Sequence, residues 1–314
     1  MAAKRIIEVG DVQAFILYVR QFTQPISQIA NISNILQQTA ASAERVFEFL
    51  DEEEEIPDTS SPLKPGSVEG RVEFKNVDFG YNPDKMVINN FTASIKPGQK
   101  VAIVGPTGAG KTTLVKLLMR FYDINAGSIL IDGYAIKEFT RHDLRSMFGM
   151  VLQDTWLYNG SIMENIRYGR LDATDKEVIA AAKAAHVDSF VRTLPNGYNM
   201  ILNEEATNVS QGQKQLITIA RAILQDPKIL IFDEATSSVD TRTEVRIKKA
   251  MDNLMKNRTA FIIAHRLSTI RDADLILVMN HGDIIEQGSH QELLAKGGFY
   301  ANLYNSQFEV PQAV

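Results

Sequence analysis

The segment Val101–Thr113 contains the residue types that phosphate binding needs, at the required spacing. Its sequence, VAIVGPTGAGKTT, fits G-x-x-x-x-G-K-[ST], with Gly105, Gly110, Lys111 and Thr112 at the defined positions. Glycines let backbone N–H groups surround phosphate oxygens, and a helix N-terminus adds positive potential. Lys111 would reach the β- and γ-phosphates, and the Thr112 hydroxyl would ligate Mg²⁺. The apolar run before this loop and the helical pattern after it favour a nucleotide site over an ordinary glycine-rich turn.

Two adjacent carboxylates follow the apolar run ILIFDE, at Asp233 and Glu234. We expect this run to be a buried strand, and open α/β sheets bind ligands at the carboxyl ends of their strands. Asp233 would hold Mg²⁺ there, directly or through water. Glu234 would orient or deprotonate an attacking water. The competing interpretation, a strand that simply ends in solvent, loses weight beside the phosphate loop.

Three further side chains are weaker candidates for the same site. His265 follows the apolar run TAFIIA and would emerge at the same sheet edge as Asp233. Gln153 ends MVLQ and offers an amide to a metal or a water. Tyr81 ends VDFGY and offers a ring for a nucleobase. Each of the three is as often a structural residue when taken alone.

The stretch VSQGQKQ, residues 209–215, predicts a capped helix start far from the phosphate loop. Ser210 and Gln213 stand in the S-x-x-Q relation of a capping box. The apolar residues that follow recur with a helical period, from Leu216 to Leu224. A capped helix start is an anion-binding site, so this second site needs a ligand of its own.

The elements that position these residues form an α/β pattern. Short apolar runs without alternation, KVAIVG, ILIFDE and TAFIIAH, predict parallel strands covered on both faces. VEFKNVDFGY and VINNFTASI predict strands of a β subdomain, antiparallel across a turn at NPDK. A helical subdomain is inserted before ILIFDE, with its clearest helix starting at the capping box TDKE. A long helix with an apolar stripe from Phe22 to Leu50 precedes them all and ends in DEEEE.

Composition excludes several classes of protein. The 314 residues are 45% hydrophobic, enough for a buried core, and carry a net charge of −5, which disfavours a nucleic-acid partner. The chain has no cysteine, so disulfides and zinc–thiolate sites are excluded. Neither a signal peptide nor a full membrane span is expected, because the apolar run AFILYV ends at Arg20.

The order of these motifs resembles the nucleotide-binding domain of ABC transporters. The resemblance covers Arg71 to about Phe308 and rests on Tyr81, GPTGAGKT, Gln153, VSQGQ, ILIFDE, SSVD and His265. It implies a P-loop NTPase of ABC type that binds ATP and Mg²⁺. The implied phosphate loop consists of Gly105, Pro106, Thr107, Gly108, Ala109, Gly110, Lys111, Thr112 and Thr113.

The resemblance also gives the other candidates a role. It implies that Tyr81 stacks on adenine and that Gln153 senses Mg²⁺ and couples to a membrane domain. It implies that Glu234 is the catalytic base and that His265 contacts the γ-phosphate, with Thr112, Gln153 and Asp233 around the metal.

The same resemblance identifies the anion at the second helix start. In the family, two domains stack head to tail around two ATP molecules. Ser210, Gly212 and Gln213 would therefore bind the ATP of a second ABC subunit, and Asp240 would lie at the dimer interface. Homodimer and heterodimer both stay open. Ser210 is flanked by Val209 and Gln211 where the family usually has Leu and Gly, which raises the hypothesis that this segment serves a weaker site in a heterodimer.

The N-terminal region is similar to the end of the last transmembrane helix of ABC exporters. We expect residues 1–52 to be that helix end with its cytoplasmic extension, 53–70 a linker, 71–308 the nucleotide-binding domain and 309–314 a tail. The chain would then be a fragment of a half-transporter that acts at the cytoplasmic face of the cell membrane. Its partners would be a membrane domain with its coupling helices, and membrane lipid through the missing part.

Other functions remain as alternatives. A soluble ABC ATPase that acts on a protein assembly would not need the N-terminal helix. A non-catalytic nucleotide-binding scaffold would not need Lys111, Asp233, Glu234 and His265 together. A P-loop kinase would leave the VSQGQ helix unexplained. The transported substrate cannot be predicted from these residues.

Overall fold

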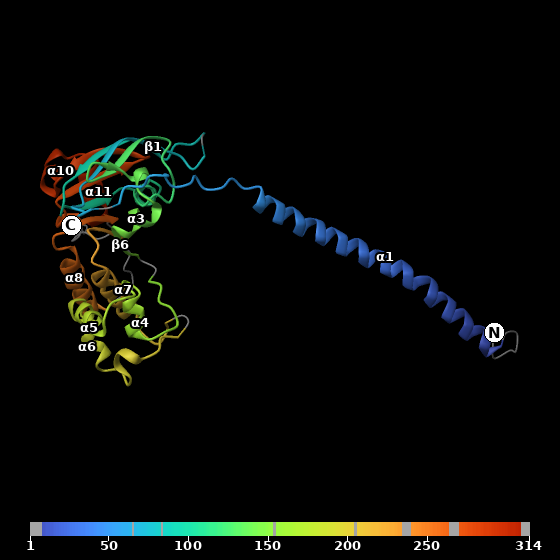
Figure 1. Cartoon of the computed structure of the whole chain (residues 1–314). Helices are drawn as coiled ribbons and strands as arrows, with labels where there is room; N and C mark the ends of the chain where they lie inside the picture. Colours follow the sequence, from blue (N-terminus) through green and yellow to red (C-terminus); the bar gives the residue numbers. More distant parts are fainter. Residues whose placement is uncertain are drawn as a thin grey trace, which may run out of the picture. The chain divides into compact units, whose positions relative to one another are not determined.

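The computed structural model describes residues 8–64, 66–82, 84–152, 155–203, 206–233, 240–263 and 270–308. The chain divides into two compact units, Met1–Pro57 and Asp58–Val314, and Figure 1 draws both. The expectations for Gln153, Glu234 and His265 fall outside the described residues.

The first unit is built on one helix, α1 (Val9–Leu50). The helix continues through Pro25 and ends at Leu50, as the start of the acidic run predicts. Its described side chains are not buried, and the apolar stripe includes Phe22 and Phe47, which are 73% and 61% exposed. Within the described part of the chain, no helix combines the length and the apolarity that a membrane span requires.

The second unit begins with an antiparallel β subdomain, which confirms that part of the predicted fold. It contains β1 (Val72–Phe79), β2 (Ile88–Ile95), β4 (Ala126–Ile131) and β5 (Tyr134–Ala135), in the order β2-β1-β4-β5. The expected turn between the first two strands is present, with Lys85 N–H donating to the Asn82 carbonyl at 3.0 Å. Edge-to-face packing of Phe74 on Phe91, 5.1 Å between ring centroids, fills the space beneath this sheet.

A six-stranded sheet forms the centre of the unit. It contains β3 (Lys100–Val104), β6 (Phe148–Val151), β7 (Ile229–Asp233), β8 (Thr259–Ile263), β9 (Leu275–Asn280) and β10 (Asp283–Gly288). The order is β10-β9-β3-β8-β7-β6, and all pairs are parallel except β10 with β9. The parallel core predicted from the apolar runs is therefore confirmed.

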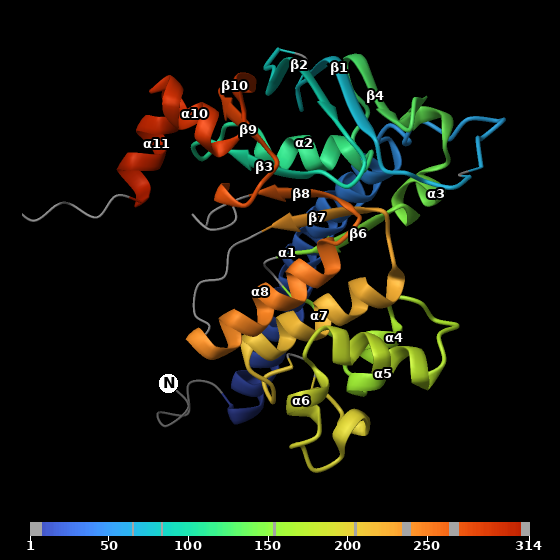
Figure 2. The same ribbon diagram turned by 90° about the vertical axis from the view of Figure 1, so that its left-hand side faces the viewer.

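Each face of this sheet packs into a different core. On β3, Val101 and Ile103 join the cluster that contains the β subdomain and α2 (Lys111–Leu118). Ala102 and Val104 point the other way, into the cluster that contains α7 (Gln211–Gln225) and α8 (Thr241–Met255). Figure 2 shows α2 on one side of the sheet and α7 and α8 on the other. Burial on both faces explains the lack of alternation in these strands.

Helices inserted between β6 and β7 form the predicted helical subdomain. They are α4 (Ile162–Arg167), α5 (Asp175–Ala184), α6 (Asp188–Val191), η3 (Gly197–Asn199) and α7. Thr174 caps α5 in a capping box with Glu177, as the sequence predicts. The remaining elements are η2 (Ile136–Glu138), α3 (Arg141–Ser146), α10 (His290–Lys296) and α11 (Phe299–Phe308).

One buried hydroxyl joins three segments at the end of the sheet. Thr259 is fully buried; its Oγ1 donates to the Gly70 carbonyl at 2.6 Å and accepts from Gly98 N–H at 3.0 Å. We expect Thr259→Val to lower the free energy of unfolding by about 2 kcal/mol, because it leaves the buried Gly70 carbonyl without this partner. Thr92→Val, which removes an exposed hydroxyl that accepts from Asn76, should cost under about 1 kcal/mol because water can replace it. Equal losses in urea unfolding would contradict this account.

The capping boxes make a prediction about acid stability. Backbone and side-chain hydrogen bonds from Ser161 lower the pKa of Glu164, and those from Thr174 lower the pKa of Glu177. A carboxylate whose pKa is lower in the folded state stabilises the fold above its unfolded pKa, and this contribution is lost as the pH falls through the folded pKa. Carboxyl NMR titration should place both midpoints below the ordinary value of 4.5, and Ser161→Ala should raise only that of Glu164.

Candidate functional site

The predicted phosphate loop joins the end of β3 to the start of α2. Gly105 follows β3 and lies so close to β9 that a Cβ there would be 2.2 Å from the Met279 carbonyl oxygen. Gly110 is the N-cap residue of α2 with φ of +100°, a backbone conformation that side chains disfavour. These two constraints explain why the loop has glycine at both ends. As a result, the N-terminus of α2 borders the space that the loop encloses.

Lys111, the first residue of α2, folds back over this loop. Its Nζ donates to the carbonyl oxygens of Gly105 at 2.8 Å and Pro106 at 3.0 Å. Burial lowers the pKa of Lys111, and the negative charge of Asp233 partly offsets that effect. The ammonium group is therefore held at the loop, beside a carboxylate that comes from a different strand.

A cavity of about 340 Å³ lies over the loop and is lined by residues of the loop itself, of α2, β7 and β8, and by Val87 before β2. The lining consists of Val87, Thr107, Gly108, Ala109, Gly110, Lys111, Thr112, Thr113, Asp233 and Ile263. Backbone donors and a cation suit phosphate oxygens. The Thr112 hydroxyl and the Asp233 carboxylate are oxygen ligands of the kind that Mg²⁺ prefers. The donor set therefore fits a phosphate chain together with a hard divalent cation.

Tyr81 lies next to the same helix. Its hydroxyl is 3.2 Å from Thr113 Oγ1 on α2, and its ring is about half exposed. Edge-to-face contacts with Phe79 and Tyr122, at 5.0 and 5.1 Å between centroids, hold the ring in place. Lys116 Nζ lies 5.9 Å from the ring centroid. A fixed aromatic face beside the phosphate loop fits the expected stacking on a nucleobase, which stays a prediction.

The predicted capped start of the second helix is confirmed. Ser210 is the N-cap residue of α7, and its Oγ accepts from Gln213 N–H at 3.3 Å. Gln213 Oε1 in turn accepts from Ser210 N–H at 2.9 Å. Ser210 and Gln211 are exposed, whereas Gly212 is buried. Ser210 and Gln211 at the start of this helix are therefore accessible to an external ligand, as an anion site requires.

The unusual residue Gln211 makes a contact that glycine would lack. Its Nε2 donates to Thr155 Oγ1 at 3.3 Å, two residues beyond Gln153 in the chain. Ala206, shortly before this helix, is buried and has φ of +50°, a backbone conformation that glycine adopts more readily than alanine. Asn203 and Thr207 exchange two hydrogen bonds.

Asp240 has a clear structural role at the start of α8. Its carboxylate accepts from Thr243 N–H at 3.0 Å as the N-cap of that helix. The side-chain hydrogen bond to Thr243 is the main reason that the pKa of Asp240 is lowered. The expected role at a dimer interface stays a prediction.

The structure thus brings together Lys111, Thr112, Asp233 and Tyr81 around one helix terminus. The described parts of the chain do not test the expected positions of Gln153, Glu234 and His265. The sequence analysis missed Tyr122 and Asn125, which support Tyr81 and the residue before it. Both residues lie in the loop after α2 and belong to none of the recognised motifs, so their position in the chain was the one signal for them.

Comparison with known proteins identifies the family to which the chain with this site belongs. The ABC transporter family model matches residues 88–237. The chain is 59% identical to a fatty acid ABC transporter ATP-binding/permease protein of Mycobacterium bovis over 94% of this chain and 46% of that protein. It is 42% identical to the ATP-dependent lipid A-core flippase of Syntrophus aciditrophicus, over 96% of this chain and 50% of the flippase.

A solved structure agrees with these relatives. The ATP-bound structure of a bacterial Atm1-family ABC exporter superimposes on this chain with a TM-score of 0.79 at 40% sequence identity. The match covers 97% of this chain and 53% of the exporter chain. The chain spans about half the length of the curated relatives it matches. Its motifs, its α/β fold and these likenesses agree. The chain therefore belongs to the ABC transporter family and carries its ATP-binding domain.

Proposed function

We propose that this chain is the ATP-hydrolysing motor of an ABC exporter. One observation carries the proposal: the start of α2, the Lys111 ammonium and the Asp233 carboxylate all line one cavity. A phosphate chain needs the first two groups, and the cation that accompanies it needs the third. A scaffold that never binds nucleotide would not require a half-buried lysine and a carboxylate in the same cavity at a sheet edge.

The nucleotide would lie along α2. The N–H groups of the phosphate loop and Lys111 would bind the phosphates, and the exposed face of Tyr81 would stack on adenine. Thr112 and Asp233 would hold Mg²⁺, which neutralises charge on the phosphates when it is bound. Support for this order comes from the contact between Tyr81 and Thr113, which fixes the aromatic ring next to the phosphate loop.

Hydrolysis would use groups beyond Asp233. By family resemblance, we assign Glu234 as the base that takes a proton from the attacking water. His265 would contact the γ-phosphate, and Gln153 would link metal and water to the membrane domain. Glu234 follows β7, His265 follows β8 and Gln153 follows β6, and these three parallel strands end at the same edge of the sheet. That common edge is the physical support for their joint action.

A second ABC subunit would complete each site. Ser210, Gly212 and Gln213 would bind the γ-phosphate held by the partner, and Asp240 would lie at the interface. The exposed start of α7 supports this, because a helix N-terminus that is open to solvent can accept an anion from outside the chain. ATP would then favour the closed pair by binding it better than the open pair, and hydrolysis would release it.

The motor would act on a membrane domain at the cytoplasmic face of the membrane. The exposed apolar stripe of α1 supports such a partner, because isolated surfaces of this kind mark interaction sites. The Trp156 and Tyr168 side chains, 61% and 53% exposed, give the helical subdomain an aromatic surface for coupling helices. Relatives that combine ATP-binding and permease parts support the same arrangement.

The nucleotide site is tested by two substitutions and a control. Lys111→Ala and Asp233→Asn should each lower the ATPase rate by about 100-fold or more, because Lys111 would neutralise negative charge on the phosphates and Asp233 would hold the Mg²⁺ that does the same. Asp233→Asn should also raise the Mg²⁺ concentration needed for half-maximal rate. Lys176→Ala, an exposed lysine on α5, controls for the loss of a positive charge. Wild-type rates in either site variant, measured by phosphate release, would refute the proposal.

The shared site is tested by mass in solution. Glu234→Gln should stop hydrolysis and trap ATP, so Mg·ATP should shift the chain from 35.0 kDa to twice that mass. Adding Ser210→Arg should abolish the shift, because the bulky cation blocks the start of α7 while the phosphate loop remains intact. Light scattering with and without nucleotide separates this effect from association through α1.

A monomer that binds Mg·ATP and does not pair would contradict a homodimer. That result would favour an unlike subunit, and co-expression with candidate partners would follow. It would also fit the hypothesis that Gln211 serves a weaker site in a heterodimer.

A further inference from the structure

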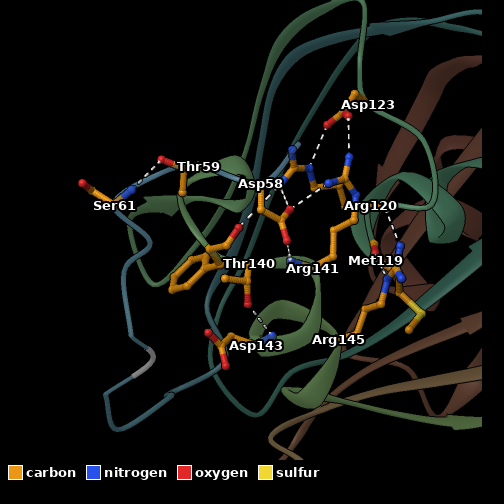
Figure 3. A network of polar contacts seen from close by, with 11 residues as sticks. Asp58, Thr59, Ser61, Met119, Arg120, Asp123, Thr140, Arg141, Asp143 and Arg145 are labelled. Atoms are coloured by element: carbon orange, nitrogen blue, oxygen red, sulfur yellow. Dashed lines mark hydrogen bonds and ion pairs between the residues drawn. The ribbon is translucent and has the colours of Figure 1, made fainter. Parts of the chain in front are cut away.

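A cluster of buried charges ties the linker to the ATP-binding domain. Asp58, the first residue of the second compact unit, accepts from Arg141 Nη1 at 2.7 Å and from Arg141 N–H at 3.1 Å. Its Oδ1 also lies 3.4 Å from Arg120 Nη1. Asp123 binds both arginines, at 2.8 Å from Arg120 Nε and 3.3 Å from Arg141 Nη2. Figure 3 shows the two carboxylates on either side of the two guanidinium groups.

The cluster pairs two carboxylates with two guanidinium groups, and the guanidinium groups are its buried members. The side chains of Arg120 and Arg141 are 4% and 10% exposed, whereas those of Asp58 and Asp123 are about one third exposed. Loss of one carboxylate leaves an excess positive charge in a site with little access to water, which is costly. Asp58 therefore stabilises the two buried cations, and the linker residues from Asp58 onward belong to the second compact unit.

The docked linker reaches the loop that follows the phosphate-binding helix. Arg120 comes two residues after the end of α2 and has φ of +51°. Arg145 holds this helix end by donating to the carbonyl oxygens of Arg120 at 2.9 Å and Met119 at 3.3 Å. The backbone at the end of α2 is thus fixed from both sides, by the linker cluster and by Arg145.

The same loop supports the nucleobase platform on its other side. Tyr122, between Arg120 and Asp123, packs its ring edge-to-face on Tyr81. Asn125 Oδ1 accepts from Gly80 N–H at 2.8 Å, and Asn125 N–H donates to the Asp78 carbonyl at 3.0 Å. The residue before Tyr81 and the ring of Tyr81 are therefore both held by the loop that Asp58 anchors.

We infer that the loop 120–125 couples linker docking to adenine binding. Tyr122 and Asn125 are positioning residues for Tyr81, and Asp58 acts on Tyr81 through the loop that carries them. The inference rests on the proposed function, because it takes the face of Tyr81 as the adenine site. A purely structural cluster would change the stability of the domain and leave the preference for adenine unchanged.

The test compares ADP with inorganic pyrophosphate, both with Mg²⁺, by calorimetry on the full chain. Neither ligand has a γ-phosphate, so each reports on one subunit. Tyr122→Leu, Asn125→Ala and Asp58→Asn should weaken ADP binding by about three- to tenfold, part of what one base gains by stacking on an aromatic ring. Binding of pyrophosphate should stay within about twofold. Glu54→Gln, an exposed linker carboxylate outside the cluster, should match the wild-type protein for both ligands.

The outcomes separate this inference from the proposed function. A wild-type chain that binds ADP no better than pyrophosphate would remove the adenine site itself. A wild-type chain that prefers ADP, with an Asp58→Asn variant that has the same preference, would overturn the coupling alone. Parallel losses for ADP and pyrophosphate in the Asp58→Asn variant would also overturn it, because they indicate a general loss of structure.

A second measurement does not depend on a substitution. Coupling between two sites is reciprocal, so ADP should slow amide hydrogen exchange in residues 58–64 and pyrophosphate should not. The Leu63 N–H, which donates to the Glu138 carbonyl at 2.9 Å, is the natural reporter. Equal exchange with the two ligands would overturn the inference.

Discussion

Burial of the central sheet on both faces is the constraint on which the rest of the structure depends. Strands such as β3 and β7 are covered above and below, so their backbone ends are where polar chemistry can begin. Parallel strands bring those ends to one edge. Lys111 follows β3 and Asp233 ends β7, which is why residues more than a hundred positions apart line one cavity.

Local patterns were enough to predict the elements that carry the site. The phosphate loop, the capped start of α7 and the α5 capping box each depend on contacts within a few residues, so their sequences determine them. The antiparallel subdomain and the parallel core followed from alternation and its absence. Resemblance to a family supplied the roles, and roles for Glu234, His265 and Gln153 remain predictions because those residues lie outside the described parts.

Long-range contacts could not be predicted in the same way. Asp58 looked like one acidic residue in a polar linker, with the domain expected to begin at Arg71, whereas the compact unit begins at Asp58. Its partner Arg141 is far along the chain, and nothing in the spacing connects them. Tyr122 likewise has its role through contact with Tyr81, which follows β1, a distant segment of the chain. Such pairs are set by the tertiary fold and leave no periodic signal.

The linker cluster shows why a domain boundary drawn from sequence has chemical consequences. A boundary at Arg71 would remove Asp58 and its ion pairs with Arg120 and Arg141, two side chains with little access to water. The loop that contains Arg120 directly follows α2, the helix proposed to bind phosphate. Because buried charges are stabilised by specific partners at short distances, the entry of the linker and the conformation of this loop depend on the same ion pairs.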